Sequence, residues 1–165
     1  MLPLLQIDRL LGLPAHPLVV HGAVVLVPLA AVAVIIVGLR ERWRRTYYFP
    51  VTLTAFVGGV FAFLAQQSGE PLSHTVRQAG KRVGDHPEQG NAAFFFAMVF
   101  AVACVILYVA HRFGPRIRRE LKLPELPVSD DLLLYAAILP FALLALFTMI
   151  VAGHSGAELV WKTNA

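Results

Sequence analysis

Four long runs of apolar residues constrain the fold of this chain more than any other feature of its sequence. The runs cover residues 18–39, 49–65, 92–110 and 132–152, and none of them contains an Asp, Glu, Lys or Arg. A helix needs about 17 to 25 apolar residues to cross roughly 30 Å of hydrocarbon. The runs also lack the alternating pattern of a membrane β-barrel strand. The sequence therefore predicts an all-α integral membrane protein with four transmembrane helices, at about 17–39, 49–66, 91–111 and 131–153.

The overall composition excludes a water-soluble fold. Hydrophobic residues make up 58% of the chain and charged residues 15%, with a mean hydropathy of +0.68, whereas soluble domains carry about 25% charged residues. No linker and no internal repeat interrupts the pattern, so we expect residues 1–165 to form one domain. The lipid bilayer is the expected surrounding of its helices.

Basic residues gather in two of the connections between the apolar runs. The first connection contains four arginines and one acidic residue, and the third contains four arginines and a lysine: Arg40, Arg42, Arg44 and Arg45, then Arg112, Arg116, Arg118, Arg119 and Lys122. Basic residues in short loops stay on the cytoplasmic side of a membrane. We therefore predict a multi-pass protein of the cell membrane with both termini outside the cytoplasm, and these arginines do not indicate nucleic-acid binding.

The second connection, which this orientation places outside the cytoplasm, has a helical pattern of its own. Leu72, Val76, Ala79 and Val83 recur at helical spacing, while basic residues and His74 occupy the other positions. This pattern is typical of an amphipathic helix that lies on a membrane surface. We expect a short extracytoplasmic amphipathic helix over residues 72–83 in addition to an up-down bundle of four helices.

Side chains that can bind a ligand gather at the predicted extracytoplasmic ends of the helices. They are His16, His21, Glu70, His74, His86, Glu88, His154 and Glu158. A four-helix bundle brings its helix ends near one another, and polar groups close to lipid need partners. The sequence therefore predicts a polar pocket on this side.

Histidine and carboxylate groups together suit zinc, iron or copper(II). We predict His21, Glu70, His86 and His154 as metal ligands, with His16 and Glu158 as secondary candidates. A second possibility is haem b, held between His21 and His154 as axial ligands. The simplest alternative is that these histidines only lie at the wet interface and hydrogen bond to one another.

Several segments together resemble one family of membrane proteins. They are residues 12–21 (GLPAHPLVVH), the Gln-Ser-Gly-Glu sequence at 67–70, His86 four residues before Gly90, and residues 153–161 (GHSGAELVW). With these segments the chain resembles the family DUF2231 over nearly its whole length, in a variant similar to those of actinobacteria. The resemblance implies a four-helix membrane protein whose signature residues lie on one side, and it names no activity.

Two classes of function follow from these observations. One is a membrane protein that binds a transition metal or haem at its extracytoplasmic face and takes part in redox chemistry. The other is a non-catalytic accessory subunit, as a homo-oligomer or within a larger membrane complex such as a respiratory one. A serine hydrolase is not indicated, because no nucleophile elbow surrounds Ser68 or Ser155. The sequence leaves open whether the protein is an enzyme.

Overall fold

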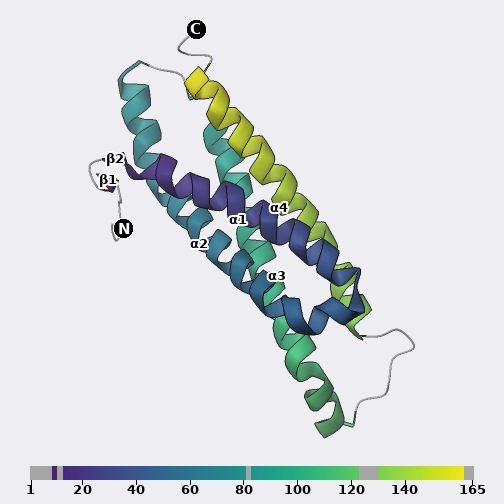
Figure 1. Cartoon of the computed structure of the whole chain (residues 1–165). Coiled ribbons are helices and arrows are strands. Elements are labelled where there is room, and N and C mark those ends of the chain that lie inside the picture. Colours follow the sequence, from purple (N-terminus) through teal and green to yellow (C-terminus); the bar gives the residue numbers. More distant parts are fainter. Residues whose placement is uncertain (1–8, 11–12, 81–82, 123–129, 162–165) are drawn as a thin grey trace.

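Four long helices make up most of the chain that the structure describes. The structure is a computed structural model, and it describes residues 9–10, 13–80, 83–122 and 130–161. The helices are α1 (Ala15–Gly38), α2 (Glu41–Gln78), α3 (His86–Glu120) and α4 (Asp130–Trp161) (Figure 1). Two short strands, β1 (Arg9–Leu10) and β2 (Leu13–Pro14), pair antiparallel before α1. The predicted four-helix, all-α bundle is confirmed.

The helices form a ring in which each packs against two neighbours. α1 contacts α2 and α4, and α3 contacts the same two helices. The start of α1, the end of α2, the start of α3 and the end of α4 lie at one end of the bundle, which we call the histidine end because His16 and His86 lie there. The opposite end, with Arg40, Arg44 and Arg112, is the arginine end. Each helix contains a stretch long and apolar enough to cross a membrane.

The helices are longer than predicted, most of all α2 and α3. α2 runs without interruption from Glu41 to Gln78. The prediction of a separate amphipathic helix over residues 72–83 is therefore wrong, because residues 72–78 are the last two turns of α2. The helix changes direction in this region (Figure 1), where Pro71 removes one backbone donor from the hydrogen-bond ladder. Gly80 then adopts a φ of 74°, a conformation that commonly follows a helix end. Residues 81–82 lie outside the described part.

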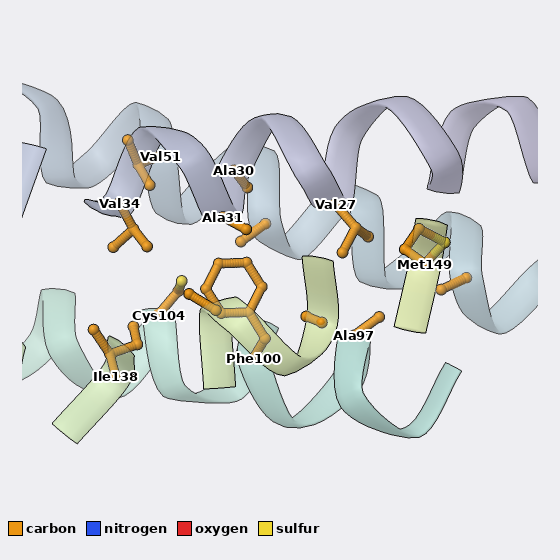
Figure 2. Packing of buried hydrophobic residues seen from close by; sticks show 14 of the residues in the cluster. Val27, Ala30, Ala31, Val34, Val51, Ala97, Phe100, Cys104, Ile138 and Met149 are labelled. Carbon is orange, nitrogen blue, oxygen red and sulfur yellow. The ribbon is translucent and has the colours of Figure 1, made fainter. Parts of the chain in front are cut away.

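Small residues bring the helix backbones close together inside the bundle. A Cβ atom on Gly58 would lie 3.1 Å from the backbone nitrogen of Val27, and one on Gly59 would lie 3.1 Å from the Cβ of Ala101. Such small residues allow helix backbones to approach closely in a membrane. Phe100 fills the space that the small residues leave at the centre (Figure 2). Large apolar side chains cover the outside, as a surrounding of lipid requires.

The turn between α1 and α2 is stabilised by one buried arginine. The guanidinium of Arg44 donates two hydrogen bonds to the carbonyl oxygen of Gly38, at 3.0 and 2.6 Å. The Tyr135 ring of α4 covers the same glycine so closely that a Cβ atom there would lie 1.9 Å from the ring. Arg44 therefore satisfies the carboxyl end of α1, where backbone carbonyls lack partners within the helix.

Candidate functional site

Two imidazole rings from different helices face each other at the histidine end. His16 lies in the first turn of α1, and His86 is the first residue of α3. Their ring centroids are 6.4 Å apart and their planes are inclined by 75°. Each histidine precedes a proline, Pro17 or Pro87, and a first helical turn tolerates proline because its N–H groups have no partner within the helix.

His16 is held by the last third of α2. Its Nδ1 atom lies 2.9 Å from the carbonyl oxygen of Ala65 and 3.3 Å from the Oγ of Ser68. A carbonyl oxygen only accepts, so Nδ1 carries the proton and donates. The Ser68 hydroxyl in turn lies 3.1 Å from the same Ala65 carbonyl.

His86 has the same set of partners on α4. Its Nδ1 atom lies 3.0 Å from the Oγ of Ser155, and the ring also hydrogen bonds to the backbone carbonyl of Ala152. The Ser155 hydroxyl lies 3.1 Å from the Ala152 carbonyl. In both cases the imidazole bonds to a serine and to the carbonyl three residues before that serine.

A glycine follows each of these serines, and each glycine lies directly against the imidazole. A Cβ atom on Gly69 would lie 2.9 Å from Cε1 of His16, and one on Gly156 would lie 3.0 Å from Cε1 of His86. Any larger residue would displace the ring. We call His16, Ser68 and Gly69 the first half-site, and His86, Ser155 and Gly156 the second half-site.

The similarity of the two half-sites was not expected, because no internal repeat is apparent along the sequence. The sequence does contain two dipeptides that each occur in both half-sites: His-Pro at 16–17 and 86–87, and Ser-Gly at 68–69 and 155–156. Histidine and serine are 52 residues apart in the first half-site and 69 in the second. A search for one fixed period therefore misses the relation.

The predicted metal ligands do not assemble as one cluster. His21 and Glu70 are exposed, and among the described residues the His21 ring bonds to its own helix, at the Pro17 carbonyl. Among the described residues, no group of three or more His, Cys, Asp or Glu side chains is placed to hold an ion. Of the four predicted ligands, His86 alone belongs to the pair of facing rings, and the secondary candidate His16 is its partner.

Helix geometry explains why His21 and His154 lie elsewhere. Five residues separate His21 from His16, which places the two side chains about 140° apart around α1. His154 precedes Ser155 by one residue and so lies about 100° away from it. Its Nε2 atom is 3.3 Å from Oε1 of Glu158, and its side chain is 74% exposed. This contact confirms that α4 continues past Gly156 and brings His154 and Glu158 to one face.

One further polar group lies beside the second half-site. The Oε1 atom of Gln89 is buried and has no hydrogen-bond partner among the residues that the structure describes. Gln89 lies three residues after His86, so the two side chains are neighbours on α3. A buried acceptor of this kind costs free energy unless a ligand or water satisfies it.

The two half-sites orient both imidazoles so that the same ring nitrogen, Nε2, can bind a ligand or a proton. With the proton held on Nδ1, the Nε2 atom of each neutral ring keeps a free lone pair, as inferred from the hydrogen-bond network. Histidines that bind metals are commonly oriented in this way, with the second ring nitrogen donating to a carbonyl or carboxylate. The pair can therefore supply two nitrogen ligands, or accept a proton at either Nε2.

Comparison with known proteins identifies one family. No curated protein and no solved structure matches the chain. A family model with the description "Predicted membrane protein (DUF2231)" matches residues 12–165, a range that includes both half-sites and all four helices. The match agrees with the four apolar helices of the structure. The chain is a polytopic membrane protein and belongs to the DUF2231 family.

Proposed function

We propose that this protein is an electron-transfer protein of the membrane in which His16 and His86 would together hold a haem. The observation that carries the proposal is the pair of facing imidazoles, 6.4 Å apart between centroids, each with Nδ1 bound to the backbone or a serine. Two nitrogens that share one ion are about 4 Å apart at most, because each is about 2 Å from the ion. The centroid separation fits a shared ion when both Nε2 atoms point toward it, because each centroid then lies behind its nitrogen.

The number of ligands favours haem over a bare ion. Structural and catalytic zinc sites take three or four protein ligands, and the described residues offer no group of three. Haem iron already has four porphyrin nitrogens and needs only one or two side chains. A bound haem would supply a one-electron couple between ferric and ferrous iron. The serines and glycines of the half-sites would fix the orientation of the two imidazoles.

The orientation of the protein is part of the same proposal. We place the chain in the cell membrane with the histidine end outside the cytoplasm, because the arginine end carries the basic residues that remain inside. Trp43→Cys and Trp161→Cys variants test this orientation with a thiol reagent that cannot cross the membrane. We expect labelling at position 161 in intact cells and no labelling at position 43. The reverse pattern would overturn the orientation and leave the haem proposal in place.

Visible absorption of the purified protein tests the haem. We expect a Soret band and an iron content of one per chain, with a low-spin spectrum from two imidazoles. His16→Ala and His86→Ala should each lose one axial ligand, and added imidazole should restore the low-spin spectrum. His21→Ala and His154→Ala are the controls, since both side chains lie outside the facing pair, and their spectra should be unchanged.

A different pattern in the same experiment would contradict the proposal. A colourless protein with stoichiometric zinc, copper or non-haem iron, lost in His16→Ala, would assign the pair to a bare ion. A colourless, metal-free protein that co-purifies with a larger complex would favour the accessory subunit predicted as the alternative.

A further inference from the structure

The arginine end contains a cavity that the histidine site does not use. It has a volume of about 510 Å³ and lies between the start of α2 and the later part of α3. These two segments are packed side by side (Figure 1). The volume is within the range of about 300 to 1,000 Å³ that is typical of small-molecule sites.

Two arginines give the cavity its charge. Arg45 of α2 and Arg112 of α3 line it, together with His111 and one carboxylate, Glu41. With two arginines and one carboxylate, the lining has a net positive charge. Arginine binds phosphate groups well because its planar guanidinium donates two parallel hydrogen bonds. The net positive charge of the lining is therefore complementary to a phosphate in a headgroup of net negative charge, and it disfavours the added cation of a zwitterionic headgroup.

Aromatic side chains form the other wall. Phe49 and Tyr108 line the cavity, and their ring centroids are 5.8 Å apart. One and two turns along α2 from Phe49, Leu53 and Phe56 are exposed, and Val105 is exposed one turn before Tyr108. Residues at this spacing share a helix face. An apolar path therefore leads from the cavity along the outer surface of the bundle.

We propose that this cavity binds the phosphate headgroup of an anionic phospholipid, with its acyl chains along the outer faces of α2 and α3. The guanidiniums of Arg45 and Arg112 hold the phosphate, and Phe49 and Tyr108 contact the upper part of the chains. Basic pockets at the ends of transmembrane helices suit such headgroups. A phosphate free in solution would use only the charged part of this site, whereas a phospholipid uses the charged part and the apolar path together.

Lipid binding to the full chain in detergent tests the proposal, with native mass spectrometry as the readout. The probes are phosphatidylglycerol, phosphatidylcholine and inorganic phosphate. We expect one phosphatidylglycerol to bind in preference to phosphatidylcholine, and phosphate not to displace it. The double variant Arg45→Gln/Arg112→Gln should lower the affinity by about tenfold or more, since each basic side chain near the membrane surface contributes to binding an anionic lipid.

A matched control removes the same charge from the same end. Arg42 and Arg119 are exposed and do not line the cavity, so Arg42→Gln/Arg119→Gln should keep the affinity within about twofold. Equal loss in both double variants would overturn the proposal, because it would show attraction to surface charge alone. Equal binding of the two lipids, or displacement by inorganic phosphate, would also overturn it. None of these outcomes depends on the haem.

Discussion

The two half-sites hold their imidazoles in the same way although the hairpins that carry them differ. In the first hairpin, α1 and α2 are joined by Leu39 and Arg40 alone. In the second, α3 extends to Glu120 and the connection to α4 covers residues 121–129. This difference between the two connections lies at the arginine end. The contacts between histidine, serine and glycine are therefore set by the local residues and do not depend on the length of the connection.

The half-sites also differ in their surroundings. Ser68 is buried, whereas Ser155 is half-buried, and the second half-site alone has the unpartnered Gln89 beside it. The first half-site lies within the hairpin of α1 and α2, which ends at Gln78. His86 of the second half-site is the first residue of the hairpin of α3 and α4. The two half-sites therefore share one arrangement, in which an imidazole packs against a serine and a glycine. The polarity around that arrangement differs between them.

The largest loss of stability is expected when the glycine of either half-site is replaced. Gly69→Ala and Gly156→Ala each place a Cβ atom within 3.0 Å of an imidazole, and overpacking of this kind costs about 1 to 3 kcal/mol. Unfolding in mixed micelles with increasing SDS measures the free energy of unfolding. Gly90→Ala is the control, because nothing lies within 4 Å of that Cβ position, and it should be neutral or stabilising. Equal behaviour of all three variants would show that the rings are not held tightly.

The serines are expected to contribute less. Ser68→Ala and Ser155→Ala each remove one hydrogen bond to an imidazole, while the bond to the Ala65 or Ala152 carbonyl remains. We expect a loss of about 0.5 to 1.5 kcal/mol in each half-site, measured by the same titration. Ser73→Ala is the control, since within the described part of the chain the hydroxyl of Ser73 donates to the Glu70 carbonyl of its own helix and hydrogen bonds to no imidazole. A large loss in only one half-site would break the equivalence.

The smallest change in the free energy of unfolding is expected at Gln89. Whether the variant is more or less stable shows whether a ligand contacts this side chain. Gln89→Met keeps the size of the side chain and removes the unpartnered Oε1 atom. If no ligand satisfies that atom, the variant should be more stable by up to about 1 kcal/mol. A loss of stability that appears only when the cofactor is bound would instead show that Gln89 contacts the cofactor. The two results are distinguished by unfolding the protein with and without bound haem.

The number and place of the helices could be predicted from the sequence, whereas the site could be predicted only in part. Apolar runs mark the segments that cross a membrane, but the helices continue into polar residues such as His154 and Glu158, where hydropathy gives no signal. The predicted ligands were chosen by helix end alone. Rotation around the helix axis then decides which side chains face inward, and it selects His16 over His21 in α1. The repeated His-Pro and Ser-Gly pairs would have indicated the residues that the structure brings together.

The interior described above has a consequence for the electrical behaviour of the protein. Among the buried residues that the structure describes, the only charged side chain is Arg44, at the arginine end, and alanine, valine and Phe100 fill the middle. Among the described residues, the buried core offers no carboxylate, lysine or histidine that could relay protons. An electron that enters and leaves at the histidine end would therefore cross little of the transmembrane voltage, where a full crossing corresponds to about 2.3 kcal/mol per 100 mV. Redox chemistry there would neither generate nor sense a membrane potential.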